Sequence, residues 1–162
     1  MGEENKGSKC IAVIRIRGTV SASMQARETL EMLHLPRNNY GALVDNRPAF
    51  MGMLKKAKDY VTFGEPSKET LTMLIKKKGR LAGDKKLTDE YAEKVGCKSL
   101  DDLAEAVYAC RTQYWKLKDI EPVFRLHPPS KGFKGKIKKD YSSGGELGYR
   151  GEKINELLKR ML

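Results

Sequence analysis

The chain has 162 residues, which is enough for one domain with an appendage and for a proper hydrophobic core. Lys and Arg number 32 against 21 Asp and Glu, so the formal net charge is +11 and the partner is expected to be anionic. We expect no membrane-spanning helix because no apolar run reaches about 18 residues, and no secretory signal because residues 1–9 are polar. The three cysteines are far apart, which argues against a disulfide framework and for a cytoplasmic protein.

The N-terminal part begins with a polar segment, residues 1–9, that we expect to be a flexible tail. Cys10–Ile16 is β-branched and almost continuously apolar, which predicts a central strand with both faces partly covered. At the end of this strand Arg15 and Arg17 share one side, and Gly18 ends it.

A helix, a second strand and another helix are predicted next. Ser21 or Ser23 can cap the first of these helices, and Pro36 stops it. Tyr40–Asp45 has the pattern of a short strand, and apolar spacing then predicts a helix over Ala49–Tyr60. Residues 10–64 therefore form a β-α-β-α core.

The segment 65–121 is predicted to be a helical insert. Ser67 is a good cap for a first helix that ends at Gly79, and Thr88 caps a short second helix. Ser99, with Asp102 three residues later, indicates the start of a third.

The last part of the chain returns to the core. Residues 122–127 contain Val, Phe and Leu and are expected to form a third core strand. Residues 128–151 form a basic, glycine-rich extension, and residues 152–162 form a final helix whose apolar stripe predicts docking onto the body. The fold class is therefore α+β with a small sheet.

The C-terminal extension, residues 128–151, is the most informative segment. Its six cations against two acids give a net charge of +4, and glycines and aromatic side chains lie between the lysines. Such a segment buries too little apolar surface to fold alone, so we expect it to become ordered against phosphates and bases. The alternative is a solvated, flexible connection.

Residues for metal or nucleophile chemistry are not grouped in this sequence. The two histidines have no metal-ligand spacing to Cys, Asp or Glu, and no C-x-x-C or G-x-S-x-G motif occurs. The glycine cluster from Gly144 to Gly151 lacks the Gly-Lys-Ser/Thr ending of a P-loop. We therefore expect no enzymatic activity, no metal, no cofactor and no small-molecule substrate.

Several stretches in fixed order give the sequence a recognisable family pattern. They are Ile14–Gly18, Thr29–Leu33, Phe63–Leu71, Phe124–Pro129, Gly144–Gly148 and Ile154–Met161. Together they resemble the large-subunit ribosomal protein L-thirty family in its long archaeal form, the counterpart of eukaryotic L-seven. One difference is Met51, which stands where many members have Arg; Arg47 or Lys55 could compensate for the missing charge.

The resemblance implies both a fold and a role. The implied fold is a three-stranded antiparallel sheet in order 3-1-2, a ferredoxin-like half with helices on one face. The implied role is a structural constituent of the large ribosomal subunit in the cytoplasm, in contact with the large ribosomal RNA, neighbouring proteins and the neighbourhood of 5S RNA.

We predict an RNA-binding surface made of cations and rings. Arg15 and Arg17 would hold phosphates together, or Arg15 would instead form a salt bridge across the strands. Phe133, Tyr141 and Tyr149 would stack on unpaired bases, or would make local core contacts. The predicted RNA-binding residues are Arg15, Arg17, Arg37, Arg47, Lys55, Lys56, His127, Lys131, Phe133, Lys134, Lys136, Lys138, Lys139, Tyr149 and Arg150.

Two other functions are alternatives for a chain of this basic composition. A small enzyme acting on an anionic substrate would need a catalytic set that the sequence does not offer. A free-standing RNA-binding regulator or chaperone would use the same cations, and stoichiometric presence on large subunits distinguishes it from a ribosomal protein.

Overall fold

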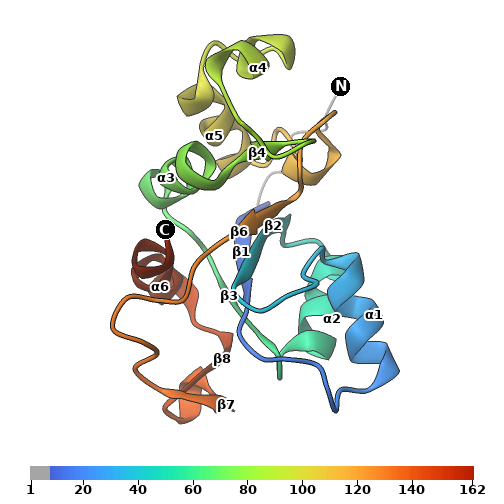
Figure 1. Cartoon of the computed structure of the whole chain (residues 1–162). Helices are drawn as coiled ribbons and strands as arrows, with labels where there is room; N and C mark the ends of the chain where they lie inside the picture. Colours follow the sequence, from blue (N-terminus) through green and yellow to red (C-terminus); the bar gives the residue numbers. More distant parts are fainter. Residues whose placement is uncertain (1–7) are drawn as a thin grey trace.

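A six-stranded sheet is the centre of the fold in a computed structural model that describes residues 8–162; the expected tail lies almost entirely outside these residues (Figure 1). The strand order is β6-β2-β1-β3-β8-β7. The strands are β1 (Cys10–Arg15), β2 (Tyr40–Asp45), β3 (Val61–Gly64), β6 (Val123–Arg125), β7 (Lys136–Asp140) and β8 (Gly145–Tyr149). β1 runs antiparallel to β2 and β3, β6 is antiparallel to β2, and β8 is parallel to both β3 and β7.

The α+β class is confirmed, but the expected sheet is wrong in its detail. The third strand of the 3-1-2 arrangement is β3, which pairs with β1, whereas residues 123–125 form an edge strand beside β2. The predicted helix over Ala49–Tyr60 stops at Ala57, because Val61 and Phe63 are buried in the sheet instead of continuing the helix. Val61 continues the apolar spacing of the preceding helix, so the pattern did not indicate that a strand begins there.

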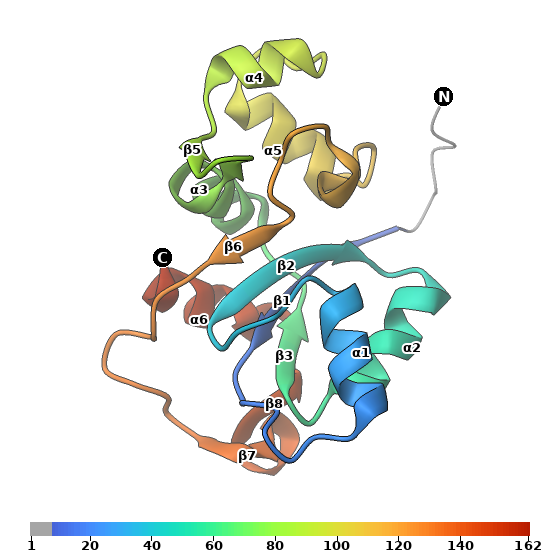
Figure 2. The ribbon, with the colours of Figure 1, turned by 45° about the vertical axis from the view of Figure 1, so that its right-hand side comes forward.

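Both faces of the sheet are covered by helices, so the expectation of helices on one face is also wrong. Helices α1 (Met24–Met32) and α2 (Pro48–Ala57) cover the face that carries Ile11 and Val13 (Figure 2). Ala12 and Ile14 point to the opposite face and join the core formed by the insert and the C-terminal helix. The predicted coverage of the first strand on both faces is confirmed, since all six residues of β1 are buried.

Three helices and a short hairpin make up the insert, which lies beyond the end of the sheet where β1 begins (Figure 1). Ser67 and Ser99 cap the first and third helices through their side chains, as predicted. The hairpin was not predicted, because its two strands have only two residues each. The elements are α3 (Lys68–Lys78), β4 (Arg80–Leu81), β5 (Lys85–Lys86), α4 (Asp89–Lys94), α5 (Leu100–Tyr108) and the 3-10 turn η1 (Tyr114–Lys116).

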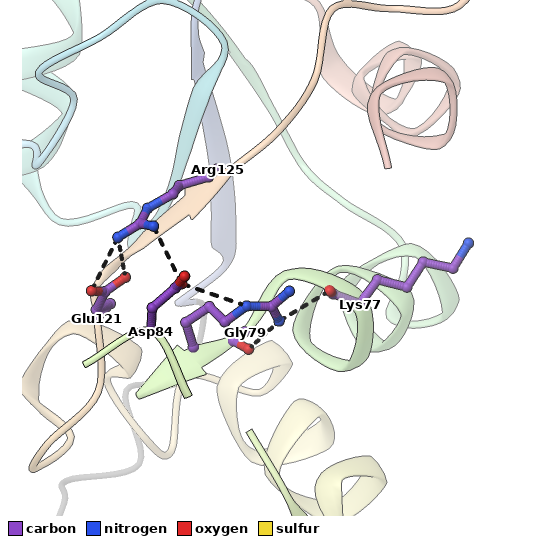
Figure 3. A network of polar contacts seen from close by, with 6 residues as sticks. Lys77, Gly79, Asp84, Glu121 and Arg125 are labelled. Atoms are coloured by element: carbon purple, nitrogen blue, oxygen red, sulfur yellow. Dashed lines mark hydrogen bonds and ion pairs between the residues drawn. The ribbon is translucent and has the colours of Figure 1, made fainter. Parts of the chain in front are cut away.

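The insert is joined to the sheet by an aromatic stack and by charged groups. The rings of Tyr114 and Phe124 stack with centroids 4.9 Å apart, and both side chains are fully buried. Beside them the guanidinium of Arg125 lies 3.2 Å from Asp84 and 3.1 Å from Glu121 (Figure 3). Asp84 also faces Arg80, whose guanidinium caps carbonyls at the end of α3.

The chain ends in helix α6 (Ile154–Met161), which docks on the sheet as predicted. Its stripe of Ile154, Leu157, Leu158 and Met161 is buried in the core shared with the insert. Two 3-10 turns, η2 (Tyr141–Ser143) and η3 (Gly151–Lys153), flank β8 before this helix. Residues far apart in sequence are thereby gathered around one sheet.

Candidate RNA interface

Much of the C-terminal extension is built into the sheet. The sequence suggests an irregular loop, but β8 pairs with β3 and β7 lies outside it as the edge strand. β7 and β8 approach closely at Gly145. A Cβ atom at this position would clash with the backbone of Lys139, so the close packing of the strands requires a glycine here. The extension therefore presents three of its five lysines, Lys136, Lys138 and Lys139, from a strand.

Buried hydrogen bonds of Arg150 attach this extension to β3. Its guanidinium donates to the Thr62 hydroxyl at 2.7 Å and pairs with the Glu146 carboxylate at 2.6 Å, and all three residues are buried. The other Glu146 oxygen accepts from the backbone N–H of Gly135 at 2.7 Å. The Arg150 guanidinium also lies 5.0 Å from the centre of the Tyr141 ring. The predicted RNA contact Arg150 is thus placed in the interior.

The five lysines of the extension are exposed. Lys134 pairs with Glu156 at 2.7 Å, and this contact lowers the pKa of the Glu156 carboxyl. The side chains of the other four make no hydrogen bond or ion pair with any residue between 8 and 162; they are Lys131, Lys136, Lys138 and Lys139. The positive charge of β7 is therefore not neutralised within the described part of the chain.

The three aromatic side chains of the segment differ in position. Phe133 is half-buried against the core, which fits the alternative of a local contact. Tyr149 is 55% exposed, its ring lies 5.7 Å from that of Phe63, and its hydroxyl donates to Glu65 at 2.9 Å. This hydrogen bond raises the pKa of the Tyr149 phenol. Tyr141 is also partly exposed.

A groove of about 240 Å³ brings the extension together with α2. Lys55, Lys58, Asp140, Tyr141 and Tyr149 are among the residues that line it. Lys56 is exposed on the same last turn of the helix. Lys58 was not among the predicted contacts, although its place one turn after Lys55 was the signal that could have identified it.

The arginines at the end of β1 have different environments. Arg15 is buried, and its guanidinium donates hydrogen bonds to the carbonyls of Arg17 and Leu35 and to the hydroxyl of Thr19. Within residues 8–162 it makes no salt bridge, so that alternative is wrong, and its donors are directed to acceptors of the chain itself. Arg17 is half-buried, donates to the carbonyl of Asp59 at 3.2 Å and lies over the Tyr60 ring.

The remaining predicted residues lie at opposite ends of the sheet. Arg37 and His127 are exposed near the end where β2 begins and β6 finishes, and the His127 ring lies 2.7 Å from the carbonyl oxygen of Leu162. Arg47 follows the other end of β2 and pairs with Asp45 at 2.6 Å. The structure thus brings Arg17, Arg37 and the α2 lysines to one end and leaves Arg47 apart.

Residues 8–162 contain neither a bilayer-spanning helix nor a metal-binding cluster. Within this range, no helix is both long and apolar enough to cross a bilayer. The same residues contain no group of three or more His, Cys, Asp or Glu side chains placed to hold a metal ion.

Comparison with known proteins identifies the family. The sequence pattern of ribosomal protein L30p/L7e matches residues 11–61. Three archaeal proteins, each named "Large ribosomal subunit protein uL30", match across nearly their whole length. Identity is 48% for Methanobrevibacter smithii and 49% for Methanococcus vannielii, with 93% of this chain and 98% of each relative covered. The chain belongs to this family.

The third of these uL30 relatives, from Archaeoglobus fulgidus, is 46% identical over 93% of this chain and 98% of its own length. The long archaeal form expected from the six motifs is confirmed by these relatives, because the match continues through the insert and the C-terminal extension. The family pattern itself covers only β1 to the start of β3. The insert and the extension are thus shared with the archaeal uL30 proteins.

Proposed function

We propose that the chain is a structural constituent of the large ribosomal subunit, located in the cytoplasm, which binds ribosomal RNA through its phosphates and has no enzymatic role. The observation that carries this proposal is the row of exposed lysines on the edge strand β7, whose side chains have no partner among residues 8–162. A groove lined by Lys55, Lys58, Tyr141 and Tyr149 includes Asp140, the last residue of the same strand. Membership of a family of large-subunit proteins supplies the setting.

Recognition uses shape and backbone. The major groove of A-form RNA is too narrow for side chains, so lysines spaced along a strand contact phosphates without reading bases. Lys136, Lys138 and Lys139 present ammonium groups from β7. Tyr149 and Tyr141 offer partly exposed rings for unpaired bases, each worth about 1–3 kcal/mol when stacked.

The two buried arginines act indirectly in this proposal. Arg150 holds β8 against β3, and Arg15 holds the loop after β1, so both position the surface without touching RNA. The direct contacts that we retain at this end of the sheet are Arg17, Arg37 and His127. Partners include neighbouring ribosomal proteins and the neighbourhood of 5S RNA.

The salt dependence of RNA binding tests the mechanism. If about six phosphates are neutralised, the affinity for purified archaeal large-subunit RNA falls with a log–log slope of roughly −4 to −5. The Lys138→Gln/Lys139→Gln double variant is expected to weaken binding and to reduce the magnitude of the slope by between about one and two. Lys94→Gln/Lys98→Gln, which changes exposed lysines on the acidic side of the insert, is the matched control. A flat salt response contradicts phosphate binding.

Sedimentation of lysate tests the ribosomal setting. We expect the tagged protein to remain with large subunits, at one copy per particle, at low salt and at about half-molar salt. Release at high salt, or sedimentation as a free protein, would favour a separate RNA-binding regulator or chaperone.

A further inference from the structure

The loop between β1 and α1 ends in a tight turn whose tip is apolar and exposed. The backbone N–H of Ala22 donates to the carbonyl of Thr19 at 3.1 Å, which closes the turn and leaves Val20 at its tip. Val20 is 92% exposed and Met24 is 75% exposed, the two highest values among the large apolar side chains of residues 8–162. Nothing in the proposed phosphate mechanism uses these side chains.

Two arginines fix the shape of this turn. Arg27 donates to the carbonyls of Thr19 at 3.1 Å and Val20 at 2.8 Å. From the other side, Arg15 donates to the Thr19 hydroxyl and to the carbonyl of Arg17, both at 3.0 Å. Burying a guanidinium without a carboxylate partner is costly. The hydrogen bonds of this guanidinium hold the loop in one conformation before any partner binds. This preorganisation lowers the entropy cost of binding.

The charge around the turn favours an anionic partner. No acidic residue occurs between Glu4 and Glu28, and Arg17 and Arg27 flank the turn. Arg37 belongs to the neighbouring loop, whose Asn38 side chain approaches the backbone at Gly18. Glu28 on α1 is the next acid along the chain, and Asp59 offers its backbone carbonyl to Arg17. An apolar tip ringed by arginines suits a nucleic acid groove better than an apolar protein surface.

We propose that this turn, residues 19–24, enters the shallow groove of a ribosomal RNA helix, an inference that rests on the proposed function. The minor groove of A-form RNA is wide and shallow and displays riboses with their 2′-hydroxyls. Val20 and Met24 contact the sugar faces there, and the exposed Ser21 hydroxyl reaches a 2′-hydroxyl. Arg17 and Arg37 meet the phosphates at the groove edges.

Substitutions that leave the net charge unchanged provide the test. Val20→Ser is expected to weaken binding to purified archaeal large-subunit RNA by about fivefold to tenfold, because the apolar contact is lost. The slope of affinity against salt stays that of the unaltered protein, since no phosphate contact is removed. Arg27→Lys keeps the charge but loses both carbonyl contacts, so it weakens binding at the same slope. Met32→Ser, an exposed methionine at the far end of α1, is the matched control and keeps full affinity.

The outcomes separate this inference from the proposed function. Full RNA affinity of Val20→Ser overturns the groove contact, whatever the lysine variants do. Full RNA affinity combined with poor incorporation into large subunits also overturns it, and assigns the turn to a protein neighbour. An unchanged salt slope in the Lys138→Gln/Lys139→Gln variant, by contrast, would reject phosphate binding by β7 and leave the Val20 result to be judged by itself.

Discussion

At the residue scale, Arg15 and Arg150 illustrate what a sequence does not disclose. Both are cations in basic surroundings, and a basic residue is rarely buried unless its donors are satisfied. Their burial depends on acceptors brought in by the fold: Leu35 and Thr19 for Arg15, and Thr62 with Glu146 for Arg150. Thr62 is distant in sequence from Arg150, so no local pattern could reveal the pair.

Arg150→Ala is expected to destabilise the protein by about 3–5 kcal/mol, because Glu146 is left as an unpaired buried carboxylate. Urea unfolding followed by circular dichroism measures the loss. Lys134→Ala removes an exposed ion pair of the same segment, which solvent screens, and is expected to leave stability almost unchanged. Equal effects of the two substitutions would contradict the buried network.

Tyr149 is expected to titrate above the ordinary tyrosine pKa of 10.0, because its hydroxyl donates to Glu65. The folded pKa is raised, so the contribution of this hydrogen bond to stability is present below about pH 10. It is lost as the pH rises through the folded pKa. Ultraviolet difference titration against Tyr149→Phe isolates the phenol. Glu65→Gln should return its pKa toward the ordinary value, and no change would disprove the assignment.

At the element scale, the sequence was sufficient where periodicity and caps agree. β2 has the predicted bounds, the Ser67 and Ser99 caps are present, and the stripe of α6 is buried. β3 was missed because Val61 continues a helical spacing, and β7 and β8 because lysines and glycines are poor strand formers. β8 forms by pairing with β3 and β7 by pairing with β8, a tertiary cause that local propensity does not record.

Gly145→Ala is expected to push β7 away from β8, since the new methyl group meets the Lys139 backbone. Hydrogen exchange should show faster exchange of the backbone amides of β7, with β8 less affected because it also pairs with β3. Gly52→Ala is the control: nothing lies within 4 Å of the new atom, and α2 gains about 0.5–1 kcal/mol of stability. Unchanged exchange in Gly145→Ala would argue against the β7–β8 pairing.

At the scale of the whole molecule, apolar packing joins the insert to the sheet more strongly than the charges of Figure 3 do. Phe124→Ala is expected to cost about 3–5 kcal/mol because the ring is fully buried. Arg125→Gln is expected to cost below about 1 kcal/mol, since its guanidinium and Asp84 are largely exposed. Thermal unfolding of both variants compares the two contributions; a larger loss in Arg125→Gln would reverse this ranking.

The position of β7 at the border of the sheet has a consequence for the chain before assembly. A free border strand offers unpaired backbone groups to any second copy, and lysine side chains discourage that pairing through repulsion. Under the proposed function the same charges have two roles: they discourage pairing between newly made copies, and bound RNA would then neutralise them. In that proposal one strand contributes both to solubility and to assembly.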